Sequence, residues 1–139
     1  MARLEWNGSE TNPAQGLPIA MSLQLTTAEA LRLWHAVNLH LVTDDEPDLS
    51  ARQLAILLIV YLEAPPHTVR ALAQRLAVTK PVITRALDAM GKLGLLGRRR
   101  DESDRRNVLV QRTLKGALFT ERLGDTITGC AGAIGRKVA

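Results

Sequence analysis

The sequence is poor in aromatic residues and in cysteine, and it has no long apolar run. Its aromatic residues are Trp6, Trp34, Tyr61 and Phe119. So few aromatic rings predict an aliphatic core, for which a hydrophobic content of 46% suffices. The single cysteine, Cys130, excludes an internal disulfide and a cysteine-clustered metal site, and it favours a reducing cytosol. The longest apolar run, Leu54–Leu62, is far shorter than the roughly 20 residues of a membrane span.

Motifs of several function classes are missing as well. We find no glycine-rich phosphate loop, no Ser/His/Asp or Cys/His arrangement and no carboxylate pair at a recognisable pocket, so we expect neither enzymatic activity nor a cofactor. The acids of 44–48 resemble the start of an EF-hand loop, but Leu49 stands where that loop needs glycine. No histidine pair has the i, i+4 spacing of a helical metal site; the histidines are His35, His40 and His67. Glu5, with no apolar stretch near it, argues against a signal peptide.

Positive charge is concentrated in the middle of the chain. Residues 51–112 hold 12 basic and 5 acidic side chains, a net of +7, whereas the rest of the chain holds 6 basic and 9 acidic ones, a net of −3. Salt screens a charge beyond a Debye length of about 8–10 Å, so binding to a polyanion needs a local excess of positive charge. A solvated basic surface would have the same composition, and the motifs must decide between the two interpretations.

The first part of the chain predicts an arm and a helix. Residues 1–25 are rich in Asn, Gly, Ser, Thr, Gln and Pro without a sustained period, which predicts an extended, partly disordered arm. Thr26 and Glu29 form a capping box, and a helix to about Val42 follows. Its apolar residues cover more than one face, which is typical of a helix that is buried or shared with a partner. We therefore expect residues 26–48, this helix and the loop after it, to take part in dimerisation.

The next helix is predicted from Ser50 to about Ala64. Ser50 and Gln53 form a second capping box at its start. The dipeptide Pro65-Pro66 ends it, because proline lacks the N–H group that a continuing helix needs.

Two shorter helices follow and predict a helix-turn-helix. Thr68 caps a helix over residues 69–77, and Thr79 caps a second helix over residues 80–93. Gly94 then closes the second helix as a left-handed cap. Two capped helices with such a short connection are typical of this motif.

Beyond Gly94 the pattern becomes extended and predicts a hairpin followed by a last helix. The runs 95–100 and 105–112 are joined by the polar residues 101–104. Thr113 caps the last helix, whose apolar residues have a near-heptad spacing that suits packing against another helix. These residues are Leu123, Ile127, Cys130, Ile134 and Val138. Glycines interrupt this helix at about 1 kcal/mol each relative to alanine, so we expect it to depend on a partner surface and to fray.

These elements together resemble the MarR (multiple-antibiotic-resistance regulator) family of winged helix-turn-helix transcription factors. The resemblance lies in the segments Leu72–Leu96, Asp101–Arg106 and Thr113–Gly116. An Asp-Arg-Arg sequence with a capping threonine nine positions after the Asp is fairly specific, whereas the helix-turn-helix alone fits several winged-helix families. The resemblance implies a mainly α fold with a small β-hairpin wing. Its winged helix-turn-helix lobe over 49–113 would lie between N- and C-terminal dimerisation helices, the latter over 114–139.

The resemblance implies a prokaryotic, cytoplasmic homodimer that binds double-stranded DNA at a pseudo-palindromic site. Members often repress transcription until a small phenolic or other ligand, or an oxidant, releases them, so a small-molecule effector is a further expectation. Cys130 fits a small buried apolar residue better than a redox switch, because no cation flanks it except Arg136. Pro81 stands where many members have a small polar residue, and the residues after Gly116 are too few for the two full helices of a typical family dimerisation region. The alternative is a winged-helix module that binds protein without specific DNA binding.

The family's recognition helix matches Lys80–Leu93, and a helix of this kind fits the major groove. The residues expected on its inward side are Ile83, Leu87 and Met90. On the outward side, Arg85 suits a guanine edge, and Thr84 suits a thymine methyl group or a phosphate. Arg85 has an alternative partner in Asp88, with which it would form a surface ion pair of little energy.

The wing and the helix N-termini complete the expected DNA contacts. The resemblance places Arg105 and Arg106 in the minor groove or on the flanking backbone, with Asp104 orienting one of them. Arg98–Arg100 alternate along a strand, so at most two of these three arginines face DNA together. The helix N-termini would offer N–H groups and hydroxyls to phosphates. The candidate DNA-binding residues are Thr68, Arg70, Thr79, Lys80, Pro81, Thr84, Arg85, Arg99, Ser103, Asp104, Arg105 and Arg106.

Overall fold

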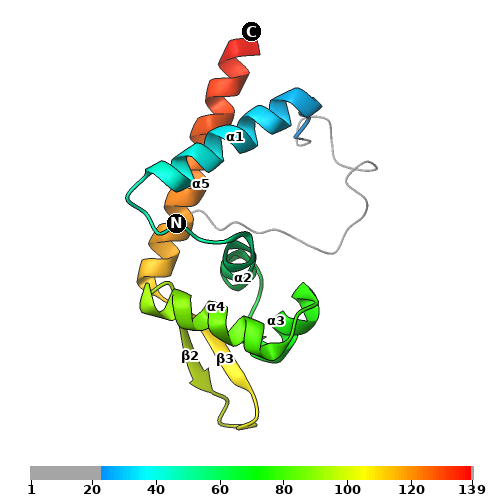
Figure 1. Cartoon of the computed structure of the whole chain (residues 1–139), viewed down its shortest axis with the longest axis vertical. Coiled ribbons are helices and arrows are strands. Elements are labelled where there is room, and N and C mark those ends of the chain that lie inside the picture. Colours follow the sequence, from blue (N-terminus) through cyan, green and yellow to red (C-terminus); the bar gives the residue numbers. More distant parts are fainter. Residues whose placement is uncertain (1–22, 139) are drawn as a thin grey trace. The chain divides into compact units, whose positions relative to one another are not determined.

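A computed structural model describes residues 23–138, and Figure 1 shows its elements. This part of the chain forms five helices and a three-stranded antiparallel sheet, which confirms the predicted mainly α, winged helix-turn-helix fold. The arm predicted over residues 1–25 lies almost entirely outside the described residues. The described residues divide into two compact units, Asp45–Asp125 and a smaller unit made of residues 23–44 with 126–138.

The larger unit begins with α2 (Ala51–Leu62), which starts at the predicted capping box. The Ser50 hydroxyl accepts a hydrogen bond from the Gln53 N–H at 3.2 Å, and the Gln53 side chain accepts one from the Ser50 N–H at 2.9 Å. The helix ends slightly before the predicted Ala64, because the backbone of Glu63 is already extended.

The helix-turn-helix consists of α3 (Val69–Leu76) and α4 (Lys80–Lys92), close to the predicted bounds. As predicted, the Thr68 hydroxyl caps α3, where it accepts a hydrogen bond from the Ala71 N–H at 3.0 Å. Ala77 ends α3 in the left-handed region with φ 54°, a conformation that turns the chain sharply toward α4.

The two ends of α4 differ in how well they follow the prediction. Thr79 is the N-cap residue, but its side chain makes no capping hydrogen bond, so that part of the prediction is wrong. The physical reason is that Pro81 has no N–H, while the Val82 N–H donates to the Thr79 backbone carbonyl at 3.1 Å. At the other end Gly94 has φ 75° and donates its N–H to the Gly91 carbonyl at 3.0 Å, which confirms the left-handed cap.

The predicted hairpin is formed by β2 (Leu96–Arg100) and β3 (Val108–Arg112), which pair antiparallel. A third strand, β1 (His67–Thr68), pairs with the other edge of β3, so the strand order is β1-β3-β2. The sequence did not predict β1, because two residues are too few to show an alternating pattern. This pairing sets Thr68, the cap of α3, opposite Leu109 and so ties the start of the helix-turn-helix to the wing.

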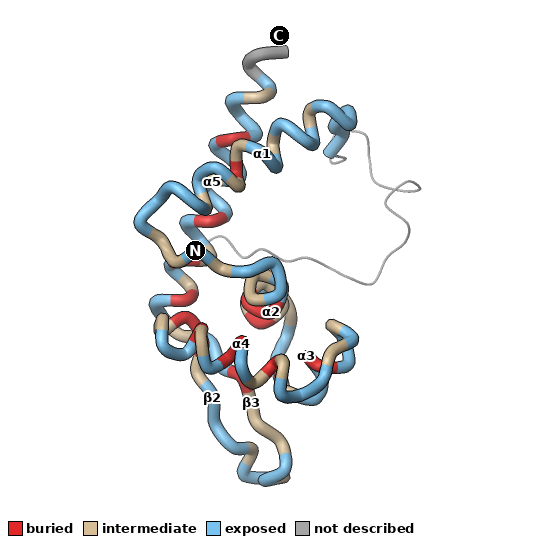
Figure 2. Tube along the Cα trace, in the orientation of Figure 1, coloured by how far each residue is buried: buried red, intermediate tan, exposed pale blue. Residues whose placement is uncertain are grey.

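One hydrophobic core holds the larger unit together, and its buried residues lie on the facing sides of α2, α4 and the sheet (Figure 2). The predicted inward residues of α4 are all buried, namely Ile83, Leu87 and Met90. The core is mostly aliphatic, as expected, and Phe119 contributes an aromatic ring to its buried residues. The face of α4 opposite this core is therefore the one that is available for binding.

Tyr61 joins α2 to the start of α5 (Leu114–Val138). Its hydroxyl accepts a hydrogen bond from the Thr113 N–H at 2.9 Å and donates one to the Leu95 carbonyl at 2.8 Å. The Thr113 hydroxyl in turn caps α5, as predicted, by accepting a hydrogen bond from the Gly116 N–H at 2.9 Å. A Cβ atom at Gly116 would overlap the Tyr61 hydroxyl oxygen, so only glycine allows this close approach.

The smaller unit holds α1 (Thr27–Thr43) and the C-terminal part of α5. The Thr26 hydroxyl accepts a hydrogen bond from the Glu29 N–H at 3.2 Å, but no bond returns from the Glu29 side chain, so only half of the predicted capping box forms. Val37 is buried, whereas several large apolar side chains of α1 are exposed. These are Leu31, Trp34, Leu39 and Val42.

The last helix, α5, is continuous through the glycines that were predicted to interrupt it. Two of its predicted packing residues, Leu123 and Cys130, are buried within the chain, and Ile127 is 37% exposed. No helix within residues 23–138 is long and apolar enough to cross a membrane.

Candidate nucleic-acid interface

The outward face of α4 carries the side chains expected to meet DNA bases. Lys80, Pro81 and Arg85 are exposed, and Thr84 is half-buried beside them. Pro81 stands in the first turn of the helix, where a missing N–H costs nothing. Two positive side chains on one face, with the positive end of the helix dipole at its start, create a positive potential on this side of α4.

The N-termini of the two helices carry the three remaining candidates outside the wing. The Thr68 oxygen accepts the capping bond of α3, which leaves its O–H available as a donor. The Thr79 hydroxyl makes no capping bond and is exposed, and Arg70 is exposed in the first turn of α3. Hydroxyl groups, N–H groups and a guanidinium at helix N-termini are the groups that typically hold phosphates.

Asp88 does not pair with Arg85, contrary to the alternative considered from the sequence. Its carboxylate forms an ion pair with the guanidinium of Arg98 on β2. Within the described residues, Arg85 takes part in no ion pair. The Arg85 guanidinium is therefore available for a contact outside the chain.

The turn of the wing is shaped by two aspartates. Asp101 accepts hydrogen bonds from the Ser103 hydroxyl at 2.6 Å and from the Ser103 N–H at 3.0 Å, and these bonds lower the pKa of the Asp101 carboxyl. Asp104 accepts from the Arg106 N–H at 3.1 Å and from its Nε at 3.2 Å, so Asp104 does orient one wing arginine, as expected. The part played by Asp101 was missed, although an aspartate two residues before a serine is a turn signal.

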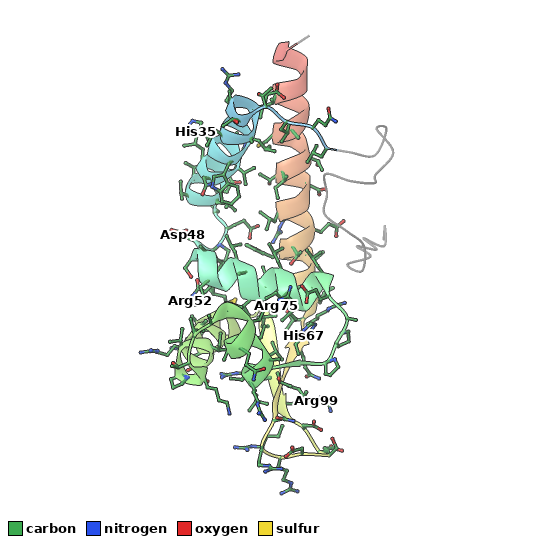
Figure 3. The ribbon with its side chains drawn as sticks, turned by 90° about the vertical axis from the view of Figure 1, so that its right-hand side faces the viewer. His35, Asp48, Arg52, His67, Arg75 and Arg99 are labelled. Atoms are coloured by element: carbon green, nitrogen blue, oxygen red, sulfur yellow. The ribbon has the colours of Figure 1, made fainter. Side chains whose placement is uncertain are left out.

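The wing exposes its arginines on more than one side. Arg105 and Arg106 are exposed at the turn, and the Arg105 backbone carbonyl accepts a hydrogen bond from Arg100 at 3.0 Å. The strand register sets Arg99 opposite Leu109 and Arg98 opposite Val110, so Arg99 and Arg98 lie on opposite faces of the hairpin. Figure 3 shows Arg99 on this hairpin.

Two further basic residues of the segment 51–112, Arg112 and Arg75, bind groups of the protein itself. Arg112 donates from Nε to the Val60 carbonyl at 2.7 Å and from its guanidinium to the Glu63 carbonyl at 2.9 Å. Arg75 hydrogen bonds the Glu63 carboxylate, which lowers the pKa of that carboxyl. His67 is buried, with Nε2 3.2 Å from the Glu63 carbonyl oxygen, and Figure 3 shows it with Arg75 at the end of α2. No local pattern in the sequence indicates the contacts of Arg112 and Arg75, because each of them joins residues at least 12 positions apart.

A cavity of about 630 Å³ lies in the smaller unit, between α1 and the C-terminal part of α5. Arg32, His35 and His40 line it from α1, and Cys130 and Ile134 line it from α5. Cys130 is 8% exposed, in agreement with the expected small buried residue.

Comparison with known families gives this geometry a context. Residues 49–108 match the model of the MarR family. The resemblance to the MarR family is thereby confirmed. The MarR family includes transcriptional regulators, and the matched segment covers α2, the helix-turn-helix and β2 and reaches the first residue of β3. No curated protein matches the sequence.

Solved structures have the same MarR fold. The transcriptional regulator Tm0710 from Thermotoga maritima is 22% identical over 78% of this chain and 71% of its own, with a TM-score of 0.59. A cysteine-to-serine mutant of MarR from E. coli, complexed with operator DNA, is 23% identical over 79% and 76% of the two chains, also with a TM-score of 0.59. A MarR family regulator from Rhodococcus sp. RHA1 is 25% identical over 78% and 71%, with a TM-score of 0.53.

Proposed function

We propose that this protein is a sequence-specific DNA-binding transcriptional regulator. Helix α4 would enter the major groove, and the wing would lie on the minor groove or the flanking backbone. The observation that carries this proposal is the exposed outward face of α4, where Arg85 makes no ion pair within the described residues. An arginine in this position suits the O6 and N7 atoms of guanine, a bidentate contact that discriminates by about 1–3 kcal/mol.

The wing supplies the second part of the interface. Arg106 is held by Asp104 but its side chain remains 92% exposed, so its guanidinium is oriented and still accessible to a phosphate or a narrow groove. Arg105 is exposed beside it, and Arg99 lies on the opposite face of the hairpin from Arg98. Ser103 donates its hydroxyl hydrogen to Asp101, so it would meet DNA as an acceptor or through its backbone.

We further propose that the regulator acts as a homodimer on a pseudo-palindromic operator. Dimerisation would involve residues 26–48 and 114–139, and DNA binding would involve residues 49–113. The exposed apolar side chains of α1 support the dimer, because water-exposed Trp and Leu side chains in one helix are typical of an interface. Repression and release by a small-molecule effector are predictions from the family resemblance.

The salt dependence of binding tests the proposal. We expect the affinity of the full chain for DNA from its own promoter region to fall steeply with salt, because each neutralised phosphate contributes about 0.9 to the slope of log K against log salt. Arg106→Ala should reduce this slope by about 1. Fluorescence anisotropy across a salt series measures both values.

A matched control is Arg122→Ala, which removes an equal charge from α5 and breaks only an ion pair with Glu46. This variant should keep the wild-type slope. A wild-type slope near zero would contradict the proposal. Retention of a protein partner through nuclease and high salt would then favour a protein-binding module.

A further inference from the structure

We propose that the Asp88–Arg98 ion pair is a positioning device that fixes the wing relative to the recognition helix. The inference rests on the proposed DNA binding. It says how α4 and the wing, the two elements that would contact DNA, are held in a fixed position relative to each other. Asp88 lies on α4 and Arg98 lies on β2, and their side chains meet through Oδ1 and Nη2. Among the ion pairs of the described residues, this is the one that joins α4 to the hairpin.

The strand register explains why Arg98 reaches α4. Arg98 is two residues from the buried Leu96 and lies opposite the buried Val110, so it shares the face of the hairpin that covers the core. The hairpin extends beyond this point to the turn that carries Arg105 and Arg106. Beyond Leu96, the residues of β2 are exposed or half-buried. Apart from the ion pair, this part of the strand therefore has little packing that would fix it against α4.

The charges also favour a positioning role over separate DNA contacts. An isolated aspartate one turn beyond Arg85 would repel phosphates, but the Arg98 guanidinium neutralises it. Arg98 is the less exposed partner, with 35% of its side chain exposed against 51% for Asp88, so it is directed toward the protein. An exposed ion pair adds little to folding stability, and the effect of removing it should therefore appear in DNA binding rather than in unfolding.

The first test measures the geometry without DNA. Spin labels at Lys92→Cys on α4 and Glu102→Cys on the wing turn, in a Cys130→Ala background, report the distance between the two elements when the labelled protein is diluted with excess unlabelled protein, which removes distances between protomers. We expect one narrow distance distribution in the wild-type pair, broader ones in Asp88→Asn and Arg98→Gln, and a narrow one again in the swap Asp88→Arg with Arg98→Asp. Equal widths in all four proteins would overturn the inference whatever the DNA measurements give.

The second test is a double-mutant cycle for binding to the promoter DNA. Asp88→Asn and Arg98→Gln should each weaken binding roughly 3- to 30-fold, and the double variant should be no weaker than either one, because the two groups act as a unit. The charge swap should recover most of the affinity, and the salt slope should stay at the wild-type value in every variant. Thermal unfolding should be unchanged.

Arg99→Gln is the matched control, since it removes the same charge one residue away on the opposite face of the strand. In the double variant, the losses of DNA-binding free energy caused by Arg99→Gln and by Asp88→Asn should be additive. The inference would be overturned if Asp88→Asn bound DNA more tightly and Arg98→Gln lowered the slope of log K against log salt by about 0.9. Arg98 would then be an ordinary phosphate contact. That result leaves the proposed function intact, whereas a wild-type protein with no salt-dependent binding would refute the proposed function itself.

Discussion

Gly116→Ala is expected to destabilise the larger unit by about 3 kcal/mol. The added Cβ would collide with the Tyr61 hydroxyl oxygen and with the Leu95 carbonyl oxygen. The second of these atoms belongs to the backbone between α4 and β2, so a side-chain rotation cannot relieve the collision. Tyr61 would have to move and lose its hydrogen bonds to Leu95 and Thr113, which join α2, the wing and α5. Urea unfolding followed by circular dichroism measures the loss.

Gly124→Ala is the matched control for this prediction. It makes the same chemical change in the same helix, but nothing lies within 4 Å of the added Cβ. Alanine is a better helix former than glycine, so this variant should gain up to about 1 kcal/mol of stability. Equal stability of the two variants would mean that the contact between Tyr61 and Gly116 does not hold the unit together.

Arg85→Ala is expected to lower the affinity for the preferred DNA site by about 1–3 kcal/mol, a factor of roughly 5 to 150. The loss should be confined to one base pair in each half-site, because a bidentate arginine reads a single guanine. Competition binding with operators changed one base pair at a time measures this: the variant should no longer distinguish substitutions at that position.

Arg106→Ala provides the comparison, since it removes the same charge from the wing. It should weaken binding to all sequences by a similar factor and leave the base preference unchanged. If Arg85→Ala behaves like Arg106→Ala, Arg85 contacts a phosphate and the assignment of α4 as the reading element is wrong.

The local parts of the fold could be predicted from the sequence because their causes are local. The Ser50 capping box, the Thr68 and Thr113 caps and the left-handed Gly94 each involve residues within a few positions of one another. The exception is Thr79, because Pro81 has no N–H and the Val82 N–H donates to the Thr79 backbone carbonyl instead of the hydroxyl. The burial of one face of α4 also followed from its 3.6-residue period.

The contacts that complete the site are long-range, and no pattern in the sequence specifies them. Asp88 had a nearer candidate partner in Arg85, and only the placement of β2 on α4 shows that Arg98 takes it. Tyr61 and Thr113 are 52 positions apart, as are Arg112 and Val60. Tertiary packing decides such pairs. The sequence therefore showed that residues 49–113 are basic, but not which of these basic side chains bind groups of the protein itself.

Selection of bound sequences from random double-stranded DNA tests the central claim most directly. We predict that the full wild-type chain enriches a pseudo-palindrome whose half-site centres lie about one helical turn apart, as a symmetric dimer with one α4 in each major groove requires. Recovery of DNA without any common sequence, or of none at all, would contradict sequence-specific binding.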